Sequence, residues 1–333
     1  MNTITTVAHP NIALIKYWGK RDEQLHLPTR SSISLTLEAF VTETTITPSS
    51  DEYDHIIVNN SQAPDRIASP ITTFINYCKN KYALSTPITI QTSNNFPTAA
   101  GLASSASGFA ALAAALNVFF SLRLSPQELS MLARQGSGSA TRSVTGGFSM
   151  WHKGVLPDGS DSYAEQLFPQ THWPELRVII AITQQDIKIQ SSRHAMQQTI
   201  ETSPDYGAWI ATSEDRIASM RNALATKDLP LLGELAEQDS LDMHQTMHTS
   251  KPPINFFVPA TYRVMRTIKE IRTKQAIPCY FTIDAGPNVK ILCLDEHVPT
   301  LLKTLNDIEG VLYCITSTIG PAVHTKDKEI HSV

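Results

Sequence analysis

The stretch from residue 87 to residue 116 constrains the fold of this chain more than any other part of the sequence. It reads as a strand (PITIQT, 87–92), a short loop (NNFPTAAGL, 94–102) and a helix of small residues (ASSASGFAALAAAL, 103–116). Nearly all side chains of the loop and of the helix start are small. A charged group can therefore approach the backbone closely at this junction, and the helix can pack tightly against its neighbours.

A phosphate group suits such a junction, because the first turn of a helix offers unpaired N–H groups and the positive end of the helix dipole. Ser104, Ser105 and Ser107 add hydroxyl donors, and the hydroxyl of Ser105 is also able to contact Mg²⁺. The P-loop pattern is excluded, because its G-K-[ST] ending is missing. From the residues alone, a helix that only packs tightly explains the composition equally well.

The whole chain predicts an α+β protein of two mixed domains, 1–180 and 181–333. In the first domain we expect strands over 31–40, 41–49, 87–92 and 146–151, and helices over 70–82, over 103–116 and from Pro126, where Ser125 and Glu128 have the spacing of a helix cap. In the second we expect strands over 176–183, 279–286, 288–294 and 310–324, and helices over 191–201, 206–225, 229–247, 258–274 and 299–306.

Charge and composition limit the partners of this chain. Its 333 residues carry a formal net charge of −4, which argues against a nucleic-acid or acidic-membrane binder. A site for anions must therefore gather its positive charge locally. We identify no secretory signal and no run near the roughly 20 apolar residues of a membrane helix. The cysteines form no CxxC pair and favour buried reduced thiols, so we expect a cytoplasmic protein: Cys78, Cys279, Cys293 and Cys314.

Four strings together resemble the diphosphomevalonate decarboxylase branch of the GHMP kinase superfamily. They are NIALIKYWGKRD (11–22) followed by LPTRSSIS (27–34), the pattern PxxxGLxSS (97–105), RQGSGSATRS (134–143) running on to Gly146 and Gly147, and TIDAGPN (282–288). Each string alone is a weak signal, but the combination is specific and covers nearly the whole chain. The resemblance implies a GHMP-kinase-like fold, with a ribosomal protein S5 domain 2-like N-terminal domain that binds ATP and a ferredoxin-like C-terminal domain.

The resemblance also implies an activity. Members of this family use ATP and Mg²⁺ to phosphorylate the tertiary C3 hydroxyl of 5-diphosphomevalonate, after which phosphate and CO₂ leave and isopentenyl diphosphate forms. Homodimers are common in the family. Two related activities stay open: decarboxylation of the monophosphate, and 3-phosphorylation of mevalonate without decarboxylation. A non-catalytic ligand sensor on the same fold is an alternative of another class.

The catalytic roles that the resemblance implies fall on four residues. Asp284 would accept the proton of the C3 hydroxyl or orient it, and Lys16 would keep that carboxylate ionised. Arg142 would grip the substrate carboxylate with its planar fork, and Ser105 would touch the transferred phosphoryl group. The alternatives from the residues alone are a turn-forming aspartate, an ion-pairing arginine and a strand that alternates between core and solvent.

The remaining site residues follow from the same motifs. Those assigned to the substrate, mainly its diphosphate, are Asn11, Tyr17, Trp18, Gly19, Lys20, Ser137, Gly138, Ser139, Ala140, Thr141, Arg142, Ser192 and Arg193. Those assigned to ATP are Asn94, Pro97, Ala100, Gly101, Leu102, Ala103, Ser104, Ser105 and Ser107. His244 and His248 have the i, i+4 spacing of metal ligands but lack the glutamate of a zincin, so we interpret them as one polar face of a helix.

Overall fold

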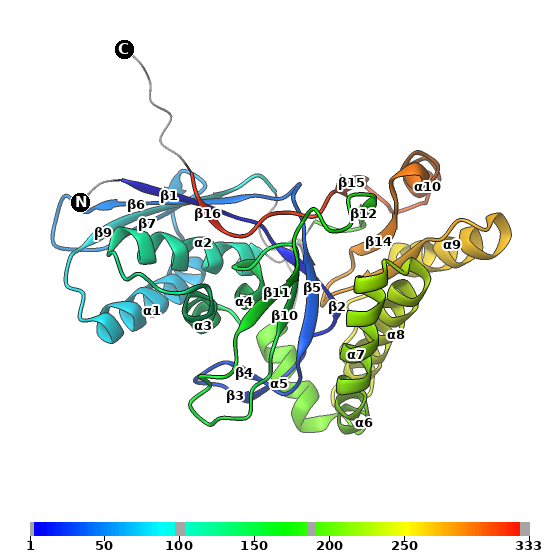
Figure 1. Ribbon diagram of the computed structural model, residues 1–333, viewed down its shortest axis with the longest axis horizontal. Helices are drawn as coiled ribbons and strands as arrows, with labels where there is room; N and C mark the ends of the chain where they lie inside the picture. Colours follow the sequence, from blue (N-terminus) through cyan, green and yellow to red (C-terminus); the bar gives the residue numbers. More distant parts are fainter. Residues whose placement is uncertain (1–2, 97–103, 186–190, 327–333) are drawn as a thin grey trace, which may run out of the picture.

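The computed structural model describes residues 3–96, 104–185 and 191–326. Figure 1 shows two layered halves, one built on a broad sheet near the N-terminus and one built on a smaller sheet with long helices beside it. A third sheet lies between them. The expected loop residues Pro97, Ala100, Gly101, Leu102 and Ala103 lie outside the described part.

The first sheet has six strands in the order β16-β1-β6-β9-β7-β8. Its strands are β1 (Ile4–Ala8), β6 (Thr42–Pro48), β7 (His55–Val58), β8 (Ser61–Gln62), β9 (Ile88–Asn94) and β16 (His324–Thr325). The helices α1 (Asp65–Tyr82), α2 (Ser104–Phe119) and α3 (Pro126–Gly136) cover one face of it (Figure 1). Alanines of α2 are fully buried against this sheet, which explains the small-residue composition of that helix.

The central sheet has the order β11-β10-β5-β2. Its strands are β2 (Asn11–Ile15), β5 (Ser32–Thr36), β10 (Phe148–Trp151) and β11 (Ala164–Phe168), and the short helix α4 (Ala140–Ser143) precedes β10. A two-stranded hairpin, β3 (Lys20–Asp22) and β4 (Leu27–Pro28), extends from the end of β2. All residues of β2 and β5 are buried, so this sheet forms the middle of the molecule.

The third sheet has the order β13-β14-β12-β15, with β12 (Leu176–Ile182), β13 (Tyr280–Ile283), β14 (Val289–Leu294) and β15 (Tyr313–Ser317). The second half also contains α5 (Ser192–Thr202), α6 (Tyr206–Ala211), α7 (Ser213–Thr226), α8 (Leu229–His248), α9 (Pro259–Gln275), the 3₁₀ helix η1 (Asp295–His297) and α10 (Val298–Asn306). Helices α7 and α8 pack against β2, and one hydrophobic core joins Ile12 and Leu14 of β2 to Ile180 of β12 and Leu232 of α8.

Most expected elements are present, and the differences have local causes. Ser125 and Glu128 do form a capping box at the start of α3. The expected helix over 206–225 is two helices, because the chain turns at Thr212 between α6 and α7. The expected strand over 310–324 is interrupted between β15 and β16, and the helix expected from residue 70 already begins at Asp65.

Two further expectations concern the whole chain. All four cysteines are free thiols, and burial raises the pKa of Cys78 to about 12, so that thiol is unreactive. Cys314 differs from the expectation in being only partly buried. Within the described ranges, none of the helices combines the length and the apolar character that crossing a bilayer demands.

A buried carboxylate on α8 fixes the end of β2. Asp239 is fully buried and accepts the backbone N–H of Lys16 at 2.6 Å. The same carboxylate pairs with Arg30 at 3.0 Å and with Arg216 at 2.8 Å. Arg30 is fully buried and stacks over the ring of Trp209, 4.2 Å from its centroid. Asp239 thereby ties the strands of the central sheet to the helices of the second half.

We expect Asp239→Asn to lower the free energy of unfolding by about 3–5 kcal/mol, because it leaves the buried Arg30 guanidinium without its countercharge. Denaturant unfolding of the two proteins measures this difference. Asp228→Asn is the matched control, since Asp228 caps the start of α8 and asparagine caps helices equally well. Equal losses in the two variants would contradict the assigned role of Asp239.

Candidate active site

A cavity of about 610 Å³ lies between elements of both halves of the molecule. Its walls come from the end of β2, the β3–β4 hairpin, the first turn of α2, the turn before α4, the start of α5 and the segment after β13. This volume suits a small-molecule site. Among the described residues, four lysines and arginines line it against one acidic side chain, although the chain as a whole is acidic: Lys16, Lys20, Arg142 and Arg193 against Asp284.

The one carboxylate of the cavity is held between two ammonium groups. Asp284 follows β13, and its Oδ1 lies 2.7 Å from Nζ of Lys16 at the end of β2. Its Oδ2 lies 3.3 Å from Nζ of Lys290, which is fully buried on β14. Lys290 also donates to the carbonyl oxygen of Asn288 at 3.1 Å. Both oxygens of Asp284 are therefore fixed in place, from strands that are far apart in the sequence.

This arrangement sets the charge of the groups. Burial on its own would raise the pKa of Asp284, but Lys16 and Lys290 outweigh it and hold that pKa well below its usual range. Burial lowers the pKa of Lys16, and its pairing with Asp284 offsets that effect only in part. Asp284 is therefore a carboxylate at all physiological pH values, and it is a hydrogen-bond acceptor rather than a strong base.

Arg142 brings a second buried positive charge to the cavity. Its Nε donates to Oδ1 of Asn11 at 3.1 Å and its Nη1 donates to Oγ of Ser32 at 2.6 Å. Burial lowers its pKa to about 10, so the guanidinium remains charged at neutral pH. No carboxylate among the described residues lies within ion-pair distance of it. A buried cation that contacts only neutral acceptors is arranged to receive an anion from solution.

Another part of the cavity wall is rich in hydroxyl and basic groups. Ser137 and Ser139 line it from the turn before α4, and their hydroxyl oxygens lie 3.1 Å apart. Ser192 and Arg193 line it from the start of α5, and Lys20 from β3 pairs with Glu23 at 2.6 Å. Other expected residues that line the cavity are Asn11, Tyr17, Trp18 and Gly138. Such a set of donors fits a diphosphate group.

Three residues expected at the substrate site do not line the cavity. Ala140 and Thr141 are fully buried in α4, and the hydroxyl of Thr141 donates to the Gly138 carbonyl at 2.6 Å. Gly19 has φ +109°, and a Cβ there would lie 1.9 Å from the hydroxyl of Tyr206. These three residues shape the backbone around the site, and none of them lines the cavity itself.

The residues at which we expect ATP begin at α2. Ser104 and Ser105 line the cavity, and the hydroxyl oxygen of Ser105 lies 3.4 Å from that of Ser137. The hydroxyl of Ser107 points elsewhere, because it is buried and bonds to Thr42 at 2.6 Å. Asn94 bonds to the same threonine at 2.6 Å and does not line the main cavity. The side chain of Ser107 therefore does not face the cavity, and its assignment as an ATP contact stays a prediction.

A second, more apolar hollow of about 190 Å³ adjoins this end. It shares Ser104, Ser105, Pro70 and Phe109 with the main cavity and contains Asn94. Its other lining residues are mostly apolar: Thr44, Val58, Ile67, Ile71, Ile90, Thr92, Gly108 and Leu112. The hollow extends along α1 and β9 from the serines of α2, so it lies beside the position where a bound phosphate would stand.

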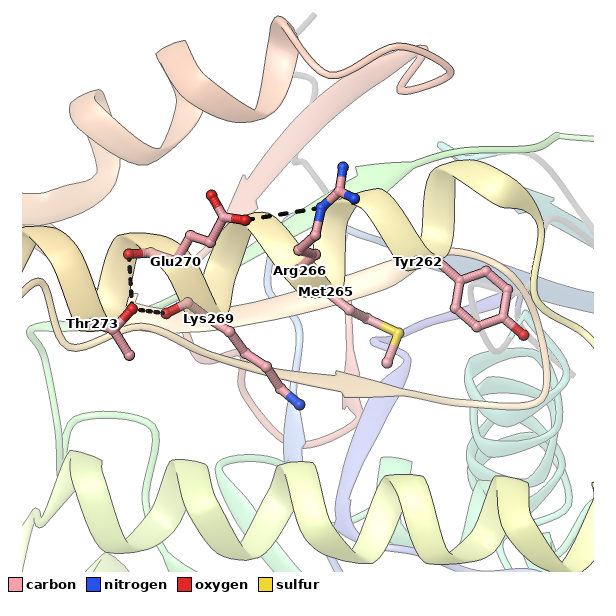
Figure 2. A pocket seen from close by; sticks show the side chains of 6 residues that line it. All are labelled: Tyr262, Met265, Arg266, Lys269, Glu270 and Thr273. Carbon is pink, nitrogen blue, oxygen red and sulfur yellow. Dashed lines mark hydrogen bonds and ion pairs between the residues drawn. The ribbon is translucent and has the colours of Figure 1, made fainter.

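A third hollow on the outer face of α9 differs from these two (Figure 2). Its basic side chains do not converge on one point, because Arg266 lies 3.9 Å from the carboxylate of Glu270 and Lys269 lies over the ring of Phe281. Thr273 bonds to backbone carbonyls of its own helix, as the dashed lines in Figure 2 show. This surface offers no buried charge and no convergent donors, so we assign it no chemistry.

Sequence reasoning missed two neighbours of Asp284. Lys290 interrupts an otherwise apolar strand (VKILCL), and a lysine in such a run was the signal that could have identified it. His244 is buried, and its Nε2 donates to the carbonyl oxygen of Asp284 at 3.2 Å. Burial lowers the pKa of His244 to about 3. The interpretation of His244 as part of a polar helix face is therefore wrong.

Known proteins share both halves of this arrangement. A model of the diphosphomevalonate decarboxylase-like N-terminal domain matches residues 8–164, and a model of the mevalonate 5-diphosphate decarboxylase C-terminal domain matches residues 178–329. This chain belongs to the diphosphomevalonate decarboxylase family. The expected membership and the expected α+β, GHMP-kinase-like fold are thus confirmed.

Individual members of the family support this. The chain is 40% identical to diphosphomevalonate decarboxylase mvd1 of Aspergillus fumigatus over 92% of its length and 80% of that protein, and 37% identical to the human diphosphomevalonate decarboxylase over 89% and 78%. The mevalonate diphosphate decarboxylase structure of Staphylococcus aureus is 38% identical, with a TM-score of 0.92 and 98% of both chains covered. The structure of MDDEF in complex with MVAPP, AMPPCP and magnesium has a TM-score of 0.89 at 38% identity, over 98% of this chain and 100% of that chain.

Residues of this decarboxylase-family site fit a nucleotide-bound Mg²⁺ better than a metal held by the protein alone. In the described ranges no group of three or more His, Cys, Asp or Glu side chains could hold a metal ion. Mg²⁺ is commonly bound through substrate phosphates with few protein ligands. The hydroxyl of Ser105 is the group of this site best placed to add a contact.

We expect Lys290→Met to lower kcat about ten- to hundredfold, because Asp284 loses the hydrogen bond that fixes its second oxygen. Without that ammonium the pKa of Asp284 rises, so the acid limb of the kcat profile moves to higher pH. The free energy of unfolding should stay within about 1 kcal/mol of wild type, because one ammonium still faces the one carboxylate. Lys303→Met, at an exposed position of α10, is the control. An unchanged kcat and pH profile would contradict this role.

Proposed function

We propose that this chain is an ATP-dependent decarboxylase that converts 5-diphosphomevalonate to isopentenyl diphosphate, with release of ADP, phosphate and CO₂. The observation that carries the proposal is one cavity of about 610 Å³ that holds both the carboxylate of Asp284, fixed by Lys16, and the buried Arg142, whose hydrogen-bond partners among the described residues are neutral. A kinase site needs a carboxylate such as that of Asp284 to orient the hydroxyl. A decarboxylase also needs a cation that binds the departing carboxylate of the substrate.

In the first step the C3 hydroxyl of the substrate becomes a phosphate ester. Asp284 accepts the hydrogen bond of that hydroxyl and directs its oxygen at the terminal phosphorus of ATP. The bond from phosphorus to the bridging oxygen of ADP breaks as the new P–O bond forms, and the hydroxyl proton is released. Lys16 lies 2.7 Å from Asp284 and is placed to offset negative charge that collects there. Mg²⁺ bound to the nucleotide supplies further charge compensation.

In the second step two σ bonds break, and two π bonds form, one between C2 and C3 and one in the departing CO₂. The C3–O bond breaks and phosphate leaves with the electron pair, which makes C3 electron-poor. The electrons of the C1–C2 bond then form the C2=C3 double bond, and C1 departs as CO₂. Arg142 holds the carboxylate so that the C1–C2 bond can align with the empty orbital at C3. Asn11 fixes the guanidinium in this position through its bond to Nε at 3.1 Å.

The two ends of the cavity divide the ligands between them. We place the substrate diphosphate against Ser137, Ser139, Lys20, Ser192 and Arg193. We place the ATP phosphates at Ser104 and Ser105 and the nucleoside in the adjoining apolar hollow. The hydroxyl oxygens of Ser105 and Ser137 lie 3.4 Å apart, where these two sets of residues adjoin.

Three broader properties rest on the resemblance to the family and on the composition of the chain. We propose a division near residue 180 into an ATP-binding N-terminal domain and a C-terminal domain, a cytoplasmic location, and assembly as a homodimer. The ligands are small molecules, and the acidic net charge of −4 disfavours nucleic acid and acidic membranes as partners.

Turnover of 5-diphosphomevalonate with Mg²⁺-ATP tests the reaction, with ADP and CO₂ both measured. We expect the two products in equal amounts and a clear preference over 5-phosphomevalonate and mevalonate. ADP without CO₂ would instead assign a 3-kinase, and binding without either product would assign a sensor.

We expect Asp284→Asn to lower kcat about a hundredfold to ten-thousandfold while both ligands still bind, because the amide cannot accept and direct the hydroxyl in the same way. Steady-state kinetics together with calorimetric binding of each ligand measure the two effects separately. Asp295→Asn, whose aspartate pairs with Arg177 outside the cavity, is the control. A near-normal rate in Asp284→Asn would remove that residue from the mechanism.

A further inference from the structure

The β3–β4 hairpin places a histidine at the diphosphate end of the cavity. His26 lies at the hairpin tip with φ +52°, a backbone conformation that histidine and asparagine adopt more readily than most residues. It is half-buried and lines the cavity together with Lys20 and Arg193. The motifs that identified the other cavity residues gave His26 no role.

Hydrogen bonding fixes which nitrogen of His26 carries the proton. Its Nδ1 lies 3.0 Å from the carbonyl oxygen of Arg134, in the last turn of α3. A carbonyl oxygen can only accept, so Nδ1 carries hydrogen and, in the neutral ring, Nε2 carries the lone pair. Nε2 has no hydrogen-bond partner among the residues that the structure describes. A second proton would have to be added at this atom.

The charges around His26 come from three elements. Burial lowers the pKa of His26, Lys20 on β3 lowers it further, and Arg193 at the start of α5 adds to this. The bond to the Arg134 carbonyl and the carboxylate of Glu23 on the hairpin act in the opposite direction. Asp22 is engaged by the backbone N–H of Leu25 at 2.7 Å. An anion that neutralises Lys20 and Arg193 would therefore favour protonation of His26.

We propose that His26 is a further contact of the substrate diphosphate, and that its Nε2 takes up a proton as the diphosphate binds and donates it in a hydrogen bond. This inference rests on the proposed function, since it takes the diphosphate end of the cavity as given. The substrate affinity then depends on pH in a specific way. The contact strengthens as the pH falls through the pKa of His26 in the complex, and it is lost as the pH rises above that pKa.

A purely structural role for His26 has to be separated from this one. The hairpin tip is also tied to α3 by Gln135, which donates to the Leu25 carbonyl at 3.4 Å. His26→Asn keeps the structural part, because asparagine tolerates the positive φ and its Nδ2 can donate to the Arg134 carbonyl. The variant removes only the group that titrates. His297→Gln, on η1 outside the cavity, is the matched control.

The experiment measures KM for 5-diphosphomevalonate between pH 6 and pH 8.5 in wild type and both variants. The substrate titrates in the same way in the assays of all three proteins. The ratio of a variant's KM to the wild-type KM at each pH therefore reports on the protein alone. We expect the KM of His26→Asn to exceed that of wild type by about three- to tenfold at pH 6 and to approach it at pH 8.5. His297→Gln should follow wild type throughout, with kcat changed little in either variant.

Calorimetry in two buffers of different ionisation enthalpy adds a direct readout. Near neutral pH, wild type should take up more protons on binding 5-diphosphomevalonate than His26→Asn does. Equal proton uptake and a KM ratio independent of pH, in variants that still turn over, would overturn the role of His26 alone. Absence of turnover in wild type would overturn the proposed function instead.

Discussion

The ion pair between Lys16 and Asp284, 2.7 Å long, is the contact on which the rest of this site depends. Its two members lie 268 residues apart and come from different sheets. Lys16 is in place because Asp239 holds its backbone N–H, and Asp284 is in place because Lys290 holds its second oxygen. The pair thereby joins the N-terminal strand that carries the KYWGK motif to the C-terminal turn that carries DAGPN.

The site keeps more positive than negative charge in a partly dehydrated space. Lys16 and Lys290 contact the carboxylate of Asp284, Arg142 lines the same cavity, and all three cations are at most 3% exposed. Buried charges in excess of their partners cost stability, and a fold tolerates them where a ligand completes the pairing. A substrate with a carboxylate at one end and a diphosphate at the other supplies the missing anions at Arg142 and at the serine-rich end. The excess of buried positive charge costs stability in the protein without substrate, and it favours binding of the substrate and stabilisation of the transition state.

The sequence predicted the elements better than the contacts between them. Helix α3 was predictable because its capping box is local, and the motif strings marked Lys16, Arg142 and Asp284. The inward turn of Ser107 was not predictable, because it depends on packing against a strand far away in the chain. The lysine in the apolar run of β14 could have marked Lys290, but its partner Asp284 emerged only from the fold. The helix over 206–225 was predicted without its break, since the turn at Thr212 leaves the pattern of apolar residues almost unchanged. Only the folded chain could therefore show that the residues of these motifs line one cavity.

The orientation of the substrate in the cavity decides whether Asp284 and Arg142 act as assigned. A crystal structure of this chain with 5-diphosphomevalonate and a non-hydrolysable ATP analogue would reveal it. We expect the substrate carboxylate to contact the guanidinium of Arg142 and the C3 hydroxyl to donate to Asp284. The diphosphate should lie among Ser137, Ser139 and Lys20. A substrate bound in the reverse direction, with its diphosphate on Arg142, or a C3 hydroxyl out of reach of Asp284, would contradict it.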